Sequence, residues 1–331
     1  MSEFRQDIVS GDWVIVASNR AKRPDELVKP KPKRVSSPRK TCPFEDLAAS
    51  GNWPAHMILP EGGTSSRWDI AVIPNKYPAL THAGGCAAAG RHALYETKSG
   101  AGEHELLITH DHAAPFADLS SATASKVFEI LQERHRILAK DGCAAYVSSF
   151  MNWGPSAGAS ISHPHYQTLA LPIVPPHVAH SLEGAASYFK AHKRCVRCDI
   201  IKTELAEKKR IVGRNAHAVA FVPFASKHPF EVAILPRRHD VSFVGASKQT
   251  LGGMAHLLQE VLRMMKRRLG DPDLNFFIHS APTNARKYPF HHWHIEVVPV
   301  NVVSPPGGFE AATSIDINVI DPDAAAKILR K

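Results

Sequence analysis

One short segment of the sequence could do chemistry on phosphorus: His163-Pro-His165-Tyr-Gln167. Side chains alternate between the faces of a strand, so His163, His165 and Gln167 would share one face. A neutral imidazole is a competent nucleophile when a carbonyl oxygen holds its second ring nitrogen. Gln167 can donate to a phosphoryl oxygen without taking a proton. The segment therefore predicts transfer of a phosphoryl or nucleotidyl group. The alternative is that both histidines are structural or bind a metal.

The residues just before this segment favour binding of an anion. Residues 152–162 (NWGPSAGASIS) are rich in Gly and Ser and include Asn152, Gly154 and Ser160. Such a loop brings backbone N–H groups close to a phosphate. Pro164 cannot donate to a sheet ladder, so the histidine segment lies at a sheet edge or begins a strand.

Two sets of side chains have the types that bind zinc. Cys195-x-x-Cys198 places two thiols on one tight turn, and His239 and His292 can complete a tetrahedral site. Without the histidines, a Cys-x-x-Cys pair is equally compatible with a redox pair or with two core cysteines. With them, a structural zinc is the better interpretation.

The other set contains one cysteine and one carboxylate. It consists of Cys42, Glu45, His112 and His163. A carboxylate oxygen is an acceptable zinc ligand, so a second zinc is predicted here. The alternative is that this site has lost its metal and that Glu45 caps a turn.

The elements that must position these residues occur twice. The order Cys, His, His-x-His is found in both halves of the chain, and a long amphipathic segment follows the single His in each. Each segment opens with Ser and closes with Gly, at Gly142 and Gly270, as helices do. Short apolar runs flank both segments and indicate strands. The sequence therefore predicts an α+β protein made by tandem duplication, with an antiparallel sheet and one long helix per repeat, over residues 119–142 and 245–270.

Composition and charge limit the other classes of function. The chain has 331 residues, 44% apolar and 21% charged, and suits about two globular domains. Most of its net charge of +9 lies in residues 20–40, a proline-containing segment that we expect to be an extended loop. A basic groove across the fold is therefore not supported, and we expect no nucleic-acid partner and no membrane partner. No signal peptide and no apolar run of about 20 residues is evident, which predicts a cytoplasmic protein. Cys86 and Cys143 are interpreted as buried small hydrophobic residues.

The segment SISHPHYQ resembles the active-site motif of galactose-1-phosphate uridylyltransferases, the transferase branch of the histidine-triad superfamily. The resemblance covers nearly the whole chain. It extends to residues 10–16 and 19–24 near the start, to CPFE, to IPNKYPAL, and to HHWHIEVVP with GGFE. It implies two tandem histidine-triad-like repeats, which we place at residues 1–175, with the nucleophile, and 176–331, with the Cys195 zinc site.

The resemblance also implies a ping-pong reaction. His165 would attack the α-phosphorus of a nucleoside diphosphate sugar, release the sugar 1-phosphate and pass the nucleotidyl group to a second sugar 1-phosphate. Gln167 would bind the transferred phosphoryl group, and Ser160 would contact the β-phosphate and the leaving group. His163 would bind zinc beside the nucleophile, and the protein would be a homodimer. The nucleotide and its phosphates would be bound by Arg20, Arg23, Asn75, Asn152 and Gly154.

Several residues depart from the family pattern. Glu45 stands where the family has a second Cys, and Cys195-x-x-Cys198 resembles two-zinc relatives such as plant-type ADP-glucose phosphorylases. Near the end of the chain, Asp316 is nearest to the position of a hexose-binding Gln. The leading prediction is uridylyl transfer between UDP-glucose and galactose 1-phosphate. The alternatives are an ADP-glucose phosphorylase, which uses inorganic phosphate, and a zinc-stabilised binding module.

The second half mirrors the active pair with His294 and Glu296. A carboxylate at the Gln position would repel a phosphoryl group, so we expect no second catalytic centre. His279, His294 and Glu296 could instead hold a metal or line the sugar pocket.

Overall fold

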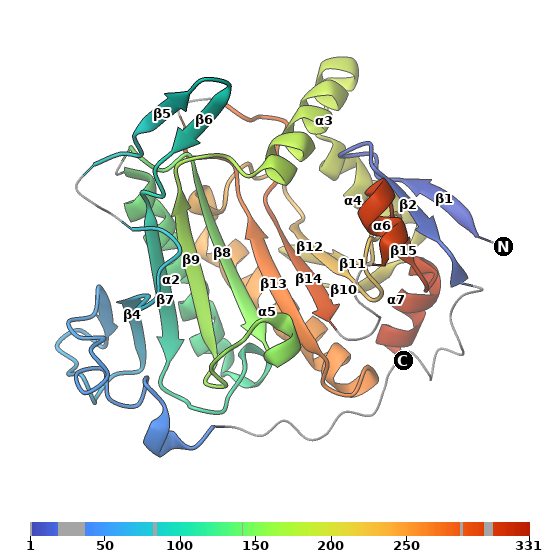
Figure 1. The fold of residues 1–331 in the computed structure, drawn as a ribbon. Helices are drawn as coiled ribbons and strands as arrows, with labels where there is room; N and C mark the ends of the chain where they lie inside the picture. The colour runs from blue at the N-terminus through green and yellow to red at the C-terminus, as the bar shows by residue number, and fades with distance from the viewer. Residues whose placement is uncertain (1, 19–36, 82–84, 141, 285–286, 301–306) are drawn as a thin grey trace.

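One sheet of ten antiparallel strands forms the centre of the molecule (Figure 1). The computed structural model describes residues 2–18, 37–81, 85–140, 142–284, 287–300 and 307–331. The strands of the first half are β3 (Met57–Leu59), β4 (Ile70–Pro74), β7 (Glu103–Thr109), β8 (Tyr146–Trp153) and β9 (His165–Leu171). Those of the second half are β10 (Ile211–Arg214), β11 (Ala218–Phe221), β12 (Val232–Pro236), β13 (Asp273–His279) and β14 (His294–Val300).

The order of the strands shows the duplication directly. It runs β10-β11-β12-β14-β13-β8-β9-β7-β4-β3, so the two halves meet where β8 pairs with β13. Counted outward from that pair, equivalent strands follow in the same order in each half: β13, β14, β12, β11, β10 on one side and β8, β9, β7, β4, β3 on the other. The predicted α+β fold with a duplicated unit is therefore confirmed. The boundary at residue 175 stays a prediction, because a single sheet runs through both halves.

Two long helices cover one face of the sheet. They are α2 (Ser121–Lys140) and α5 (Lys248–Arg268), which lie side by side behind the sheet in Figure 1. Their apolar sides enter the main core, as the sequence pattern predicts. The predicted caps are present. The Ser120 hydroxyl accepts from the Thr123 N–H, the Ser247 hydroxyl accepts from the Thr250 N–H, and Gly142 and Gly270 have positive φ.

The two halves also exchange equivalent contacts across this core. Gln132 of α2 donates through Nε2 to the carbonyl oxygens of Phe243 and Ala246, at 2.8 Å each. Gln259 of α5 donates in the same way to two carbonyl oxygens of the first half, at 3.0 and 2.8 Å. The accepting carbonyls lie in or beside the short 3-10 turns η5 (Phe243–Gly245) and η3 (Phe116–Asp118). Each long helix thus fixes the turn that precedes the other.

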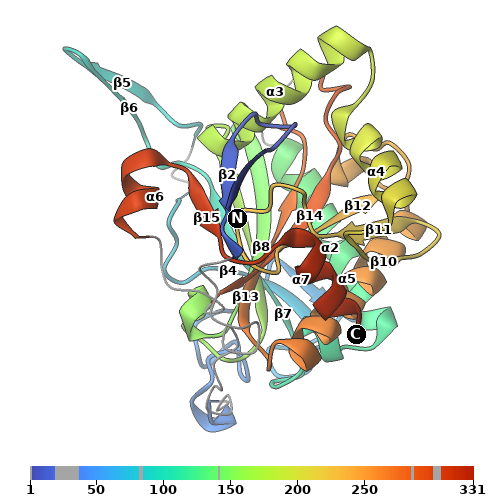
Figure 2. The ribbon, with the colours of Figure 1, turned by 90° about the vertical axis from the view of Figure 1, so that its right-hand side faces the viewer.

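The opposite face of the sheet is covered differently in its two halves. Over the second half lie α3 (Pro176–His192), α4 (Val196–Glu207) and a small sheet of β1 (Glu3–Gln6), β2 (Trp13–Val16) and β15 (Asp316–Asn318) (Figures 1 and 2).

The chain ends with α6 (Gly308–Thr313) and α7 (Pro322–Arg330). The hairpin of β5 (Ala89–His92) and β6 (Tyr95–Lys98) projects from the body, with every residue exposed (Figure 2). Among the described residues, no helix has the length and apolar character to cross a bilayer.

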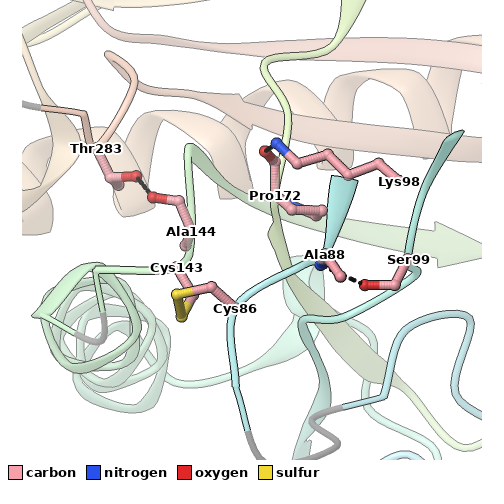
Figure 3. Close-up of a disulfide and its surroundings, with 8 residues drawn as sticks. All are labelled: Cys86, Ala88, Lys98, Ser99, Cys143, Ala144, Pro172 and Thr283. Atoms are coloured by element: carbon pink, nitrogen blue, oxygen red, sulfur yellow. Dashed lines mark hydrogen bonds between the residues drawn. A yellow bond between two sulfur atoms is a disulfide. The ribbon is translucent and has the colours of Figure 1, made fainter. Parts of the chain in front are cut away.

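A disulfide joins Cys86 to Cys143 (Figure 3). The prediction that these were two buried small hydrophobic residues is therefore wrong. Cys86 is exposed and Cys143 is partly buried, and the bond joins the segment before β5 to the turn after α2. The two residues are 57 apart in sequence and belong to no local motif, so only the fold reveals their proximity. The other three cysteines are free.

Candidate active site and metal-ligand clusters

His165 is held in the form that a nucleophilic imidazole requires. Strand β9 begins at this residue, directly after Pro164 as predicted. The ring atom Nδ1 lies 2.9 Å from the carbonyl oxygen of His163, which can only accept, so Nδ1 carries the hydrogen. Nε2 is left with its lone pair and has no hydrogen-bond partner within the described part of the chain. Burial lowers the pKa of His165, partly offset by this hydrogen bond, which favours the neutral ring.

Packing on both faces of β9 holds this geometry. The Phe44 ring, from the CPFE segment, meets the rings of His163 and His165 edge-on, with centroids 5.4 and 5.7 Å apart. On the other face Tyr166 is fully buried against Phe116 and Phe276. The strand therefore alternates as predicted, with Tyr166 in the core and His165 turned to the opposite face.

Gln167 lies on the same face of β9 and is held by a residue that sequence reasoning missed. His104, on the neighbouring strand β7, places Nε2 2.9 Å from Gln167 Oε1. The side-chain nitrogen of Asn75 lies 3.0 Å from the same ring atom, and the Asn75 N–H donates to the His104 carbonyl. Asn75 and Gln167 therefore meet at one imidazole. The signal available in the sequence was the spacing of His104 and Leu106. Residues two apart in a strand lie on the same face, so both lie on this face of β7.

The remaining predicted substrate-binding residues lie around the segment between β8 and β9. Asn152, near the end of β8, accepts through Oδ1 from the side chain of Asn275 at 2.8 Å. Gly154 adopts φ 92°, a conformation that favours glycine, and begins the turn η4 (Pro155–Ala157). Ser160 is exposed in the chain that leads to β9. Arg20 and Arg23 lie outside the described residues, as does most of the basic segment 20–40.

The first predicted metal cluster is assembled in the structure. Its ligand atoms all lie within 4.8 Å of one another and belong to Cys42, Glu45, His112 and His163. It adjoins the candidate nucleophile, because His163 is both a cluster member and the residue whose carbonyl accepts from His165.

The hydrogen bonds of the two cluster histidines fit a bound cation. Nε2 of His112 lies 2.7 Å from the Ser37 carbonyl oxygen, and Nε2 of His163 lies 2.7 Å from that of Thr109. With Nε2 of each ring directed at a carbonyl, Nδ1 of each ring faces the Glu45 carboxylate, at 2.7 Å from His112 and 3.9 Å from His163. A ring proton or a metal ion satisfies this arrangement. Lone pairs that converge on one point repel one another unless a cation lies between them.

The second predicted cluster is assembled as well. Its ligand atoms, from Cys195, Cys198, His239 and His292, also lie within 4.8 Å of one another. Cys195 caps the N-terminus of α4 and Cys198 lies in its first turn, which brings the two thiols together. Cys198 Sγ is 3.4 Å from His239 Nδ1 and 3.5 Å from His292 Nδ1. The neighbouring Cys198 thiol and His292 lower the pKa of Cys195, which favours the thiolate that metals bind.

The second half carries the mirrored pair without the same chemistry. His294 Nδ1 is 3.2 Å from the His292 carbonyl oxygen, as in the first half. Glu296 occupies the place of Gln167 and is bonded to His279, whose ring stacks on that of His294 at 4.6 Å. These residues line a cavity of about 930 Å³ beneath α3, α4 and the N-terminal strands. Asp316 begins β15 in the small sheet. The predicted roles of these four residues stay predictions.

Two family models match the chain. One is described as "Galactose-1-phosphate uridyl transferase, N-terminal domain" and matches residues 1–175, more than half of the 331 residues. The chain belongs to the galactose-1-phosphate uridylyltransferase family. The second model, described only as a domain of unknown function, matches residues 89–330.

Individual relatives of this uridylyltransferase-family enzyme match it over nearly its full length. It is 31% identical to an ADP-glucose phosphorylase of Arabidopsis thaliana, over 99% of this chain and 92% of the relative. It is 26% identical to a galactose-1-phosphate uridylyltransferase of Thermotoga maritima, over 100% of this chain and 98% of the relative. Both relatives are named as enzymes of this nucleotidyltransferase family, so the predicted enzyme class is confirmed.

Solved structures agree with the fold. An Arabidopsis thaliana ADP-glucose phosphorylase with bound ADP-glucose matches with a TM-score of 0.82 at 30% identity, over 100% of this chain and 98% of that one. A solved uridylyltransferase matches with a TM-score of 0.77 at 27% identity, over 100% and 97%. The uridylyltransferase-like fold predicted from the sequence is therefore confirmed.

Proposed function

We propose that this enzyme transfers a nucleotidyl group from a nucleoside diphosphate hexose through a covalent intermediate on His165. The observation that carries the proposal is the hydrogen bond of its Nδ1 to the His163 carbonyl, at 2.9 Å. It fixes the tautomer and leaves the Nε2 lone pair as the attacking group.

In the first half-reaction Nε2 of His165 attacks the α-phosphorus of the sugar nucleotide. The N–P bond forms while the bond from that phosphorus to the bridging oxygen breaks, and the hexose 1-phosphate leaves with its electron pair. The positive charge that develops on the ring is stabilised by the His163 carbonyl, because Nδ1 keeps its hydrogen throughout. In the second half-reaction a phosphate oxygen of the acceptor attacks the same phosphorus, and the N–P bond breaks.

The other predicted residues receive roles in this scheme. Gln167 donates its amide hydrogens to a non-bridging oxygen of the transferred phosphoryl group. Ser160 contacts the β-phosphate and the leaving group, and Asn75, Asn152 and Gly154 contact the nucleotide or its phosphates.

We also propose that both ligand clusters bind zinc. Zinc is four-coordinate with Cys, His and carboxylate ligands in structural sites, and the two clusters supply such sets. Zinc would stabilise the local fold rather than take part in the transfer. In the first half it would fix His163, and thereby the carbonyl that accepts from His165.

Two sugar nucleotides are candidate substrates. The sequence motifs favour UDP-glucose with galactose 1-phosphate as the acceptor, and relatives named for that activity match most of the chain. ADP-glucose with inorganic phosphate is favoured by the higher identity, 31%, to an ADP-glucose phosphorylase and by the structural match to that protein with ADP-glucose bound. The chemistry at His165 is the same in both cases.

The deciding experiment is the intact mass of the purified protein after exposure to UDP-glucose or to ADP-glucose without an acceptor, at neutral to basic pH. A UMP-sized adduct that is missing in His165→Ala supports uridylyl transfer, and an AMP-sized one supports the phosphorylase. An adduct that persists in His165→Ala, or none with either substrate, refutes the covalent mechanism. A zinc-stabilised binding module predicts instead that His165→Ala leaves binding intact.

The predicted homodimer and cytoplasmic location stay predictions. Light scattering during size-exclusion chromatography tests the first, and fractionation of the source cells tests the second.

A further inference from the structure

The two nitrogens of the His104 imidazole determine how the Gln167 amide is oriented. The Ala79 N–H donates to His104 Nδ1 at 3.2 Å, so Nδ1 must be the acceptor nitrogen of the ring. The single ring hydrogen then lies on Nε2, which donates to Gln167 Oε1 at 2.9 Å. An amide turned the other way would set its NH2 group against this N–H. The ring hydrogen therefore favours the orientation in which Gln167 Oε1 faces His104 Nε2.

The other contacts of the ring keep it in place. The Asn75 N–H donates to the His104 carbonyl at 2.8 Å, and Asn75 Oδ1 accepts from the Tyr77 N–H at 2.9 Å. The Asn75 side-chain NH2 lies 3.4 Å from Nδ1 and 3.0 Å from Nε2. Because Nε2 carries the ring hydrogen, Nδ1 is the ring atom to which this NH2 can donate. The segment from Asn75 to Ala79 thus wraps around the His104 ring, and that ring is half-buried.

The strand register places this pair beside the nucleophile. Leu106 of β7 lies directly opposite Gln167 of β9, and His104 is two residues further along the same face. His165 is two residues from Gln167 on that face. With Oε1 held by His104, the amide nitrogen of Gln167 is the group left to meet a ligand.

We propose that His104 is a positioning residue that orients the Gln167 amide, so that its NH2 group and not its oxygen faces the transferred phosphoryl group. The inference rests on the proposed function. A phosphoryl oxygen can only accept, so an amide with its oxygen forward would repel it. In this proposal His104 acts through the Gln167 amide and not directly on the substrate.

The kinetic test is a double-mutant cycle that uses His104→Leu and Gln167→Ala, singly and together. The rate of nucleotidyl-adduct formation is measured in single-turnover reactions with UDP-glucose or ADP-glucose. His104→Leu should slow this step on the order of tenfold, less than the loss of an entire oriented donor, with little change in substrate affinity. In the Gln167→Ala background the same change should have no further effect, because His104 acts only through that amide.

A conservative variant and a control complete the kinetic test. His104→Gln can place an amide nitrogen where the ring has Nε2 and should recover most of the rate. His92→Leu, on the exposed hairpin, should leave the rate unchanged. Multiplicative losses in the double variant, or no recovery by His104→Gln, would overturn the proposal.

Nitrogen NMR of the His104 ring provides a readout that needs no turnover. In the intact protein the ring should carry its hydrogen on Nε2, and a hydrogen on Nδ1 overturns the proposal. This separates the two failures. A wild-type protein that forms no adduct refutes the proposed function, while the NMR result decides the orientation by itself.

Discussion

His135 should make the stability of the protein depend on pH in a predictable direction. It lies on α2 with 1% of its surface exposed, and burial lowers the pKa of His135 from 6.5 to about 3. Its Nε2 is 2.8 Å from the Ser149 hydroxyl, which is bonded in turn to Thr168 on β9. The ring is therefore neutral in the folded protein at pH values where the unfolded chain binds a proton.

The sign and size follow from that difference. Above about pH 6.5 both states are neutral and the ring adds no pH dependence. As the pH falls below this value, His135 binds a proton in the unfolded state but stays neutral in the folded state. The free energy of unfolding therefore decreases until about pH 3. About pH 5 is roughly 1.5 units below the pKa of the ring in the unfolded chain. The loss in the free energy of unfolding at that pH is therefore about 2 kcal/mol.

Urea unfolding of the wild type and of His135→Gln, followed between about pH 7.5 and pH 5, measures this effect. The Gln amide nitrogen reaches the position of Nε2 and keeps the bond to Ser149, while the contact of the ring with Phe243 is lost. The variant should be less stable at the higher pH, by about 1–2 kcal/mol. The gap should then close by about 2 kcal/mol at the lower pH, because only the wild type has the buried imidazole.

Subtraction of the two curves removes the other buried histidines, which both proteins share. Leu138→Ala is the matched control, since it deletes buried volume from the same helix without a titratable group. Its curve should run parallel to that of the wild type. A parallel curve for His135→Gln as well would refute the reasoning. It would mean that His135 binds a proton as readily in the folded state as in the unfolded state.

Four further variants test other parts of the structure. Gln132→Leu and Gln259→Leu each remove two buried hydrogen bonds to carbonyls and should each lower the free energy of unfolding by about 2–4 kcal/mol in urea; a loss below about 0.5 kcal/mol from either would contradict the role assigned to it. Replacing Cys86 and Cys143 together by Ser opens a link between residues 57 apart and should cost about 4 kcal/mol, seen as a lower thermal midpoint that no longer responds to reductant. Cys195→Ser should remove one equivalent of zinc, by elemental analysis, and reduce thermal stability more than the turnover of the remaining protein; equal losses would count against a purely structural metal.

The elements with strong local signals could be predicted from the sequence. Helices α2 and α5 have regular apolar spacing, Ser caps and terminal glycines, and the structure places them where the sequence does. Both metal-ligand clusters were found because Cys and His are chemically specific and recur in the same order. Helices α3 and α4 were not predicted, because few of their residues are buried and their periodicity is correspondingly weak.

The contacts that no local pattern contains could not be predicted. The bond between His104 and Gln167 depends on which strands become neighbours, since β7 and β9 are separated by a helix and another strand. The disulfide of Cys86 and Cys143 likewise depends on where two loops meet. The residues of the histidine segment were identifiable because their types and alternation suffice. His104, which we propose orients the Gln167 amide, comes near it only through the tertiary structure.

The pairing of β8 with β13 has an evolutionary consequence. Two separate copies of one repeat, joined through these edge strands, would form a symmetric pair in which any substitution appears twice. Because one chain carries both copies here, each copy can change alone while the shared sheet is preserved. The amide at Gln167 and the carboxylate at Glu296 occupy corresponding positions and differ in this way. Covalent fusion thus lets a symmetric scaffold hold an asymmetric pair of sites, which a homodimer of identical single repeats could not do.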